Sequence, residues 1–192
     1  MRIVGGQFRG RPLATPQDER VRPTSDRVRE AVFNILAHGV PDFSLQGAKV
    51  MDLFAGTGAL GLEAVSRGAS YCLFVEQDAD ARGLIRRNVE AFGLSGVTRI
   101  FRRDATDLGP ANSRDAFNLV FADPPYGRGL GEKALAAATE GGWLTSNAIA
   151  VLEEAASSTV AMPSGFDELD RRTWGDTQVV FARFGGAGDR ET

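Results

Sequence analysis

An acid, two prolines and an aromatic residue, Asp123-Pro124-Pro125-Tyr126, end the apolar run at residues 117–122. Because proline cannot donate a hydrogen bond to a strand ladder, the strand must stop there and the backbone must leave the sheet. A carboxylate, carbonyl groups and an aromatic ring then lie at the carboxyl end of a strand, where open α/β sheets bind ligands. Together they can hold the exocyclic amine of a base while the ring stacks on that base. The alternative is an ordinary turn, in which Asp-Pro and Pro-Pro are common.

Three glycines form a second candidate site. Gly56, Gly58 and Gly61 fit G-x-G-x-x-G directly after an expected strand, and Glu76 ends the next strand twenty residues after Gly56. Glycines at such a turn let the backbone approach a ligand closely, and the acid can accept both hydroxyls of a ribose. The pattern fits a nicotinamide dinucleotide as well as another nucleoside cofactor. Alternatively, the glycines serve only tight packing between helix and sheet.

Two observations favour S-adenosylmethionine (SAM) over a dinucleotide: the position of Asp52, and the Asp-Pro-Pro-Tyr motif after the fourth expected strand, the neighbour of the first strand across the switch point of the sheet. Asp52 lies four residues before Gly56, where its carboxylate would repel a pyrophosphate but would suit the cationic methionine part of SAM. Asp104 ends a third expected strand, where it can accept a hydrogen bond from adenine N6. We therefore predict a SAM site formed by Asp52, Phe54, Gly56, Gly58, Glu76 and Asp104.

Alternating hydrophobic patterns predict the elements that position these residues. Strands are expected at 48–53, 71–76, 97–102, 117–122 and 148–153, and helices at 59–67, 78–92 and 130–140. Such repetition predicts a parallel sheet with helices on both faces. A hairpin at 168–174 and 178–184 would make one terminal strand antiparallel. The combination is typical of the Rossmann-like class I SAM-dependent methyltransferase sheet.

The N-terminal residues differ from this alternation. Residues 3–13 predict short strands or a hairpin, and a helix capped by Thr24 or Ser25 is expected to run to about residue 37. We predict one methyltransferase domain over 1–184, with a basic arm and helix at 1–38 and a catalytic core at 48–184. Residues 185–192 are expected to form a flexible tail.

Charge is distributed unevenly along the 192-residue chain. The net charge is −3, but residues 1–30 carry seven arginines against four acids, which gives +3 there and −6 for the remainder. Arginine pairs bidentately with phosphate and stacks on bases. A basic arm on an acidic body therefore favours a nucleic-acid partner over an ordinary solvated surface.

Composition excludes several classes of protein and site. Cys72 and His38 are the single cysteine and histidine, so the chain has no internal disulfide and no Cys cluster for zinc or iron–sulfur, and no metal is expected. There is no apolar run of about 18–20 residues and no apolar secretory segment at the N-terminus. A reduced, cytoplasmic location is expected.

The chain resembles the RsmD family, the bacterial 16S ribosomal RNA (guanine-N2)-methyltransferases. Asp-x-Phe-x-Gly-x-Gly at 52–58 together with Asp-Pro-Pro-Tyr resembles SAM-dependent enzymes that methylate exocyclic amines. The block Arg-Pro-Thr-x-Asp-Arg-Val-Arg-Glu at 22–30 is more specific to the family. The likeness extends over about residues 1–184.

The resemblance implies methyl transfer from SAM to N2 of a guanine in small-subunit rRNA. Asp123 and a carbonyl of Pro124 or Pro125 would hold the amine, and Tyr126 would stack on the extruded base. The resemblance also agrees with a substrate within the small ribosomal subunit or a late assembly intermediate, and a monomer is expected. The arginines expected to contact RNA phosphates are Arg9, Arg11, Arg22, Arg27, Arg29 and Arg128.

Two other functions remain compatible with these residues. An adenine-N6 methyltransferase acting on DNA or RNA would use the same Asp-Pro-Pro-Tyr motif. A non-catalytic RNA-binding module with a SAM fold is disfavoured because the four acids Asp52, Glu76, Asp104 and Asp123 occur together. Calorimetry with SAM separates the module from an enzyme, and identification of the methylated nucleoside separates guanine from adenine.

Overall fold

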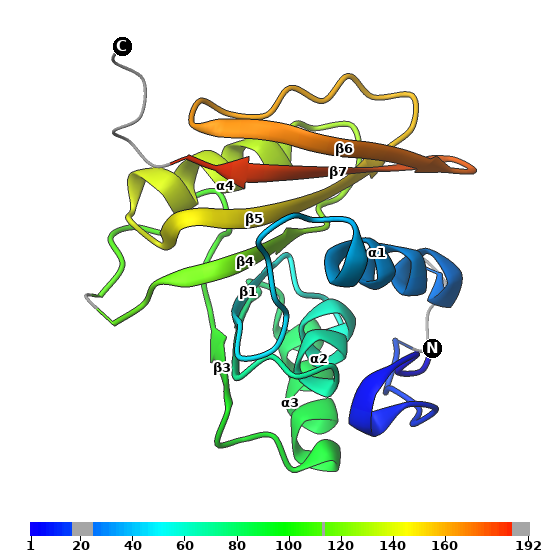
Figure 1. Cartoon of the computed structure of the whole chain (residues 1–192). Coiled ribbons are helices and arrows are strands. Elements are labelled where there is room, and N and C mark those ends of the chain that lie inside the picture. The colour runs from blue at the N-terminus through cyan, green and yellow to red at the C-terminus, as the bar shows by residue number, and fades with distance from the viewer. Residues whose placement is uncertain (17–24, 113, 186–192) are drawn as a thin grey trace.

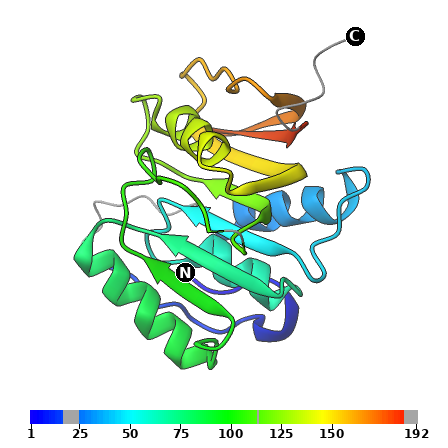
Figure 2. The same ribbon diagram turned by 90° about the vertical axis from the view of Figure 1, so that its left-hand side faces the viewer.

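The computed structural model describes residues 1–16, 25–112 and 114–185, which form a seven-stranded sheet covered by helices (Figures 1 and 2). The strand order is β3-β2-β1-β4-β5-β7-β6. The strands are β1 (Lys49–Leu53), β2 (Tyr71–Val75), β3 (Thr98–Phe101), β4 (Phe117–Ala122), β5 (Leu144–Ala155), β6 (Phe166–Trp174) and β7 (Thr177–Phe184). Neighbours from β3 to β5 pair in parallel, whereas β7 runs antiparallel to β5 and β6. The predicted parallel sheet with a C-terminal antiparallel hairpin is confirmed.

Helices lie on both faces of the sheet, as predicted. They are the 3-10 helix η1 (Gly6–Phe8) and the α-helices α1 (Asp26–His38), α2 (Ala59–Ser66), α3 (Ala79–Phe92) and α4 (Leu130–Glu140). In the part of the chain that the structure describes, no helix is long and apolar enough to cross a membrane.

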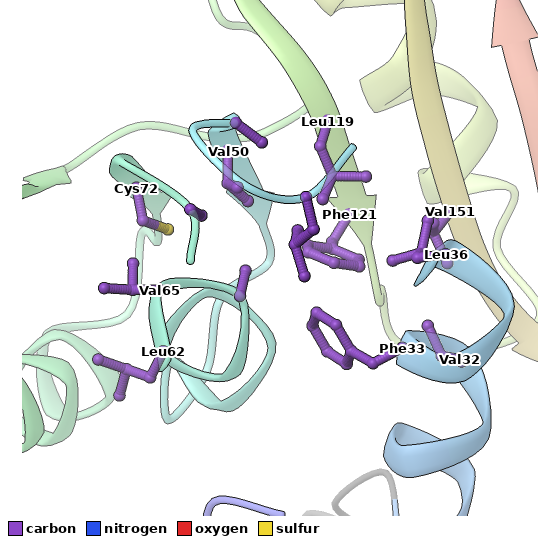
Figure 3. Close-up of a cluster of buried hydrophobic side chains, with 14 of the residues drawn as sticks. Val32, Phe33, Leu36, Val50, Leu62, Val65, Cys72, Leu119, Phe121 and Val151 are labelled. Carbon is purple, nitrogen blue, oxygen red and sulfur yellow. The ribbon is translucent and has the colours of Figure 1, made fainter. Parts of the chain in front are cut away.

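Two buried clusters lie on opposite faces of the sheet, because successive strand residues point to alternate sides. On one face, strand residues such as Val50 and Phe121 pack with α1, α2 and α3 (Figure 3). On the other face, strand residues such as Met51 and Val120 pack with α4 and Trp143. Burial on both faces makes the central strands a firm base for the loops that leave their ends.

Side-chain caps determine where α1 and α3 begin. Ser25 Oγ accepts a hydrogen bond from the Val28 N–H at 3.2 Å. Of the two predicted caps, Thr24 and Ser25, it is therefore Ser25 that caps α1. Asp78 Oδ1 accepts from the Ala81 N–H at 2.8 Å at the start of α3. Such caps contribute about 1 kcal/mol each. They fix two helices that pack on the same face of the sheet.

The N-terminal arm, residues 1–16, is less regular than the predicted hairpin. The Ile3 N–H donates to the Arg11 carbonyl and the Gly10 N–H to the Ile3 carbonyl, but Arg2 and Pro12 form an isolated β-bridge and not part of a strand ladder, and η1 occupies the bend. Proline has no N–H with which to extend a ladder. The arm instead buries Ile3 and other apolar residues in the cluster of α1, α2 and α3.

Strand β5 begins at Leu144, four residues before its predicted start. Leu144 pairs with Phe117 and Ile149 with Leu119, so the register with β4 shifts between these pairs. Asn147 lies in this stretch with a φ of 64°. The polar residues that precede the predicted strand are therefore an irregularity within β5.

Candidate functional site

The register of the parallel strands brings the predicted site residues to one edge of the sheet. Leu53, the last residue of β1, pairs with Val75 of β2 and Ala122 of β4. The residues that follow, Phe54 and Asp123 among them, therefore leave the sheet side by side. The strand order reverses about β1, so this edge is the switch point at which open α/β sheets bind ligands.

The glycine loop, residues 54–58, contains three residues in the left-handed region of backbone conformation. Phe54 has a φ of 57°, Gly56 of 57° and Gly58 of 79°. A Cβ at Gly56 would meet only the Phe54 carbonyl within 4 Å, so the space above it is open. A Cβ at Gly58 would lie 3.2 Å from the Phe74 ring. Gly56 therefore suits close approach of a ligand, whereas Gly58 is also required by packing.

Gly61 and Asp52 form a buried contact beneath the glycine loop. A Cβ at Gly61 would lie 2.5 Å from Cys72 Sγ and from the Phe74 ring, so this glycine serves helix–strand packing, the alternative considered for the motif. Asp52 is 1% exposed, and its Oδ2 accepts a hydrogen bond from the Gly61 N–H at 2.9 Å. Asp52 therefore supports the first turn of α2 directly.

Burial raises the pKa of Asp52 to about 8, against the lowering effect of the Gly61 hydrogen bond, and the nearby Glu76 raises it further. The carboxyl group is therefore largely neutral at pH 7. Attraction between an Asp52 carboxylate and the cationic methionine of SAM, the reason for predicting this residue, thus requires Asp52 to lose its proton first. Contact between Asp52 and the cofactor stays a prediction.

Glu76 joins the end of β2 to the glycine loop. Its Oε2 accepts from the Gly56 N–H at 2.9 Å, and its Oε1 accepts from the Asp78 N–H at 2.9 Å. Each carboxylate oxygen can accept two hydrogen bonds, so both retain capacity for a ribose hydroxyl. The two backbone donors hold the half-buried carboxylate in one orientation.

Asp104 lies beyond the end of β3 and is exposed. Its Oδ1 accepts hydrogen bonds from the backbone N–H and the hydroxyl of Thr106, each at 2.8 Å. These bonds orient the side chain at the same edge as Glu76. Among the described residues, no group of three or more His, Cys, Asp or Glu side chains is arranged to hold a metal ion.

The Asp-Pro-Pro-Tyr loop, residues 123–127, leaves β4 with a half-buried Asp123 and a buried Pro124. The Tyr126 side chain is 39% exposed, although the end of its ring is held: its hydroxyl donates to Glu153 Oε1 and lies 3.3 Å from Thr177 Oγ1. Burial and the bond to Glu153 raise the pKa of Tyr126 well above its usual value. The tyrosine is therefore a protonated, tethered ring with one exposed surface.

Glu153 and Glu154 of β5 support this loop, and the sequence analysis missed both. Glu153 is 6% and Glu154 2% exposed. Glu154 Oε1 accepts from the Gly127 N–H at 2.9 Å. Two acids directly after the apolar run at residues 148–152 were a detectable signal, because buried carboxylates need specific partners.

The structure contradicts the prediction that Arg29 contacts RNA. Its side chain is fully buried in α1, and its Nη2 lies 2.8 Å from Asp26 Oδ1. Its Nε lies 3.5 Å from Glu63 Oε2, and it also donates to the Arg2 carbonyl. The arginine fork thus joins α1, α2 and the N-terminal arm, and has no surface left for a phosphate.

The other predicted RNA contacts fall into three groups. Arg9, Arg27 and Arg128 are exposed, as phosphate binding requires. Arg11 is exposed, but its Nη2 donates to the Ala91 carbonyl at 2.6 Å. Arg22 lies outside the described residues. Arg9, Arg11, Arg27 and Arg128 remain predicted RNA contacts.

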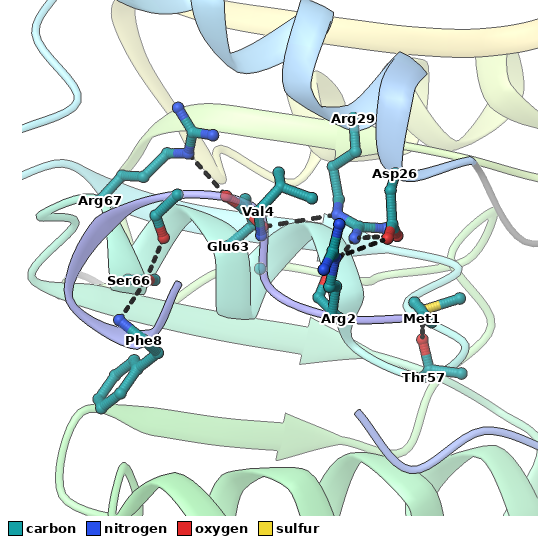
Figure 4. A network of polar contacts seen from close by, with 12 residues as sticks. Met1, Arg2, Val4, Phe8, Asp26, Arg29, Thr57, Glu63, Ser66 and Arg67 are labelled. Carbon is teal, nitrogen blue, oxygen red and sulfur yellow. Dashed lines mark hydrogen bonds and ion pairs between the residues drawn. The ribbon is translucent and has the colours of Figure 1, made fainter. Parts of the chain in front are cut away.

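The N-terminal arm is seated on α2 by further buried side chains that the sequence analysis did not identify (Figure 4). Glu63, fully buried, accepts from the Val4 N–H at 2.8 Å and pairs with Arg67 Nε at 2.7 Å. Ser66 Oγ accepts from the Phe8 N–H at 3.0 Å. A carboxylate within the apolar run of α2 was the available signal. The arm is therefore an integral part of the structure around the site.

Comparisons with known proteins agree with this fold. Residues 1–183 match the model of a family described as conserved hypothetical protein 95. The chain is 39% identical over 153 residues to the Escherichia coli (strain K12) protein named ribosomal RNA small subunit methyltransferase D, covering 80% of this chain and 74% of that protein. The Haemophilus influenzae protein of the same name is 32% identical over 177 residues, 91% of this chain and 89% of that protein. The solved structure of the Escherichia coli protein yhhF is similar with a TM-score of 0.81 at 32% identity, covering 96% of this chain and 97% of that one. The predicted class I methyltransferase fold is confirmed.

Proposed function

Because this chain belongs to the RsmD family, the family described as conserved hypothetical protein 95, we propose that it methylates the exocyclic N2 of a guanine in 16S ribosomal RNA. Ribosomal RNA methylation is the broader activity that family membership carries. The cofactor is SAM, which supplies an electrophilic methyl group on a sulfonium centre. Guanine N2 and 16S rRNA are the finer parts of the proposal.

The observation that carries the proposal is the pairing of β1 with β4. Leu53 and Ala122 are register partners, so the glycine loop and the Asp-Pro-Pro-Tyr loop begin at adjacent strand ends. A cofactor bound at the glycine loop and a base bound at the Asp-Pro-Pro-Tyr loop would therefore lie next to each other at the carboxyl ends of β1 and β4. Such proximity supplies much of the barrier reduction in a transfer reaction.

The residues at the cofactor side suit a nucleoside carrying a ribose. Gly56 has open space where a side chain would stand, which allows a ligand to contact the backbone. Glu76 is oriented by two backbone donors and would accept the ribose hydroxyls. Asp104, exposed beyond the next strand, would accept from adenine N6.

The target amine is a poor nucleophile because its lone pair is delocalised into the guanine ring. Asp123 and the carbonyl of Pro124 or Pro125 would accept hydrogen bonds from its two N–H groups and so pull the nitrogen toward a tetrahedral geometry, with its lone pair localised and directed at the sulfonium methyl. Asp123 would also accept the proton that becomes acidic as the nitrogen is methylated. These effects are positioning and electrostatics, and they require no covalent intermediate.

Tyr126 would stack on the extruded base through its exposed ring surface. Stacking on an aromatic side chain is worth on the order of 1–3 kcal/mol, comparable with the cost of unstacking the base. The tether between its hydroxyl and Glu153 reduces the rotamer freedom that stacking would otherwise remove. The ring is thus ready to receive the base.

The substrate is proposed to be 16S rRNA within a small subunit or late assembly intermediate. The first thirty residues carry +3 and the remainder −6, so general attraction to nucleic acid is weak. Recognition then depends on shape-specific docking, with Arg9, Arg11, Arg27 and Arg128 holding phosphates. A folded particle offers that shape better than naked RNA.

The proposal is tested by methyl transfer to small subunits isolated from cells that lack this gene. We expect the wild-type protein with SAM to methylate them and nucleoside mass spectrometry to identify N2-methylguanosine. N6-methyladenosine as the product would favour the alternative reaction on adenine. Binding of SAM by calorimetry without transfer to any rRNA substrate would favour the RNA-binding module.

A further inference from the structure

The side chain of Asn88, on α3, joins the N-terminal arm to the glycine loop. Its Oδ1 accepts from the Ala14 N–H at 2.7 Å, and its Nδ2 donates to the Ala14 carbonyl at 3.2 Å. The same Nδ2 donates to the carbonyl of Thr57 at 3.0 Å. Asn88 is 2% exposed, so these bonds are shielded from water. One amide thus holds two segments that are 43 positions apart in the chain.

Both bonded segments lie directly beside the proposed ligands. Thr57 stands between Gly56 and Gly58, in the loop that would contact SAM, and its hydroxyl also lies 3.6 Å from Met1 Sδ of the arm (Figure 4). Ala14 belongs to the arm that carries Arg9 and Arg11. The contact therefore connects the proposed cofactor site with the proposed RNA-binding segment.

The chemistry of this position requires an amide. Asparagine supplies an acceptor and two N–H donors in one plane, which suits one backbone N–H and two carbonyls. Aspartate of the same size would keep the acceptor but would set an oxygen against the Thr57 and Ala14 carbonyls. An unsatisfied buried polar group is costly, so the arm at Ala14 or the glycine loop at Thr57 would no longer be held against α3.

We propose that Asn88 is a positioning residue through which RNA binding on the arm and cofactor binding in the glycine loop strengthen one another. The protein has two states in this proposal. In the first, the arm is hydrogen-bonded to Asn88 and Asn88 also holds Thr57; in the second, the arm is released from Asn88. RNA that binds the arm in the first state also stabilises the glycine loop in the conformation that binds the cofactor. A cofactor bound in that loop stabilises the arm in its contact with Asn88 in the same way. The coupling must be equal in both directions. This inference rests on the proposed function, because it assumes an RNA ligand on the arm.

The test measures the affinity for S-adenosylhomocysteine by calorimetry, with and without saturating unmethylated small subunits, since this product permits no turnover. For the wild-type protein we expect subunits to tighten binding at least about fivefold. For Asn88→Asp, once circular dichroism shows that the variant is folded, we expect the ratio of the affinities with and without subunits to fall to about one. At saturating SAM and subunits, kcat should change much less than the KM for SAM measured at saturating subunits.

A matched control and a second variant complete the experiment. Asn118 Oδ1 accepts from the Lys49 N–H at 2.7 Å at the opposite, amino-terminal edge of β1, so Asn118→Asp perturbs a similar contact away from the site. We expect this control to retain the wild-type ratio. Ala14→Pro removes the N–H that Asn88 accepts without altering α3, and we expect it to lose the coupling as well. It tests the inference if Asn88→Asp does not fold.

Two results would overturn the inference while the proposed function stands. In the first, the wild-type protein methylates the subunits, but subunits do not change its affinity for the cofactor. In the second, the folded variants keep the wild-type affinity ratio and only their Tm is lower. The latter would make Asn88 merely structural. Wild-type protein that neither binds nor methylates subunits would overturn the proposed function, and this inference with it.

Discussion

The cofactor side and the target side of the candidate site are held in different ways. At the glycine loop and the first turn of α2, acids accept hydrogen bonds from backbone N–H groups: Glu76 from Gly56, and Asp52 from Gly61. At the Asp-Pro-Pro-Tyr loop, Glu154 likewise accepts from the Gly127 N–H, but the exposed element is a side chain, and the Tyr126 hydroxyl donates to Glu153 of β5. The cofactor side therefore presents a shaped backbone, whereas the target side presents a ring whose position depends on one hydroxyl. Binding and chemistry should accordingly be separable by mutation.

The largest expected effect is on chemistry at the target side. Asp123→Ala should reduce turnover by about 10²-fold or more, the scale for losing one preorganised polar group. SAM affinity should stay nearly unchanged, because Asp123 would face the amine and not the cofactor. Single-turnover rates and calorimetry measure the two quantities. A mutant with the wild-type rate would remove Asp123 from its proposed role.

The converse change belongs to the cofactor side. Glu76→Ala should weaken SAM binding at least tenfold, because hydrogen bonds to a charged group are worth about 1.5–3 kcal/mol each. Turnover at saturating SAM should change far less. Glu90→Ala, at an exposed position of α3, is the control and should bind SAM normally. Unchanged affinity in Glu76→Ala by calorimetry would exclude Glu76 from the cofactor site.

A pH dependence should mark the buried acid of the cofactor side. The raised pKa of Asp52 means that the folded protein keeps a proton that the unfolded chain releases above its own pKa of 3.8. Stability should therefore fall as the pH rises from about 4 to 8, at up to about 1.4 kcal/mol per pH unit from this group. Asp52→Asn should remove that slope. Denaturant unfolding of both proteins across this range gives the difference, and parallel curves would contradict it.

The smallest effect is expected from the hydroxyl of the target-side ring. Tyr126→Phe keeps the stacking surface but loses the bond to Glu153, so turnover should fall only a few-fold, the scale of about 1 kcal/mol for one hydrogen bond. Tyr71→Phe, at the start of β2, is the matched control and should retain the wild-type rate. Single-turnover kinetics measures both. A loss as large as that of Asp123→Ala would mean that the hydroxyl takes part in the chemistry.

The sequence predicted what short segments determine. The glycine spacing and the prolines after β4 act within a few residues of the backbone they shape, and the alternating patterns gave the parallel sheet and its antiparallel end. Residues whose partners lie far away in the chain were missed, such as Glu63, whose bond to Val4 spans 59 positions. Arg29 was misassigned because a count of charges treats a buried arginine like an exposed one. Asn147 concealed the start of β5 because a polar residue within an irregular strand has the composition of a loop.

The seating of the N-terminal arm has a consequence for the order in which the protein can mature. The ribosome makes the arm before its partners Glu63, Ser66 and Asn88, which follow with α2 and α3. Until then the apolar side chains of Ile3 and Leu13 are exposed to water, although less than a tenth of the surface of each is exposed in the folded protein. Contacts of long sequence separation form late and slowly. The arm is thus translated before the residues that hold it, and is among the last segments to reach its native position.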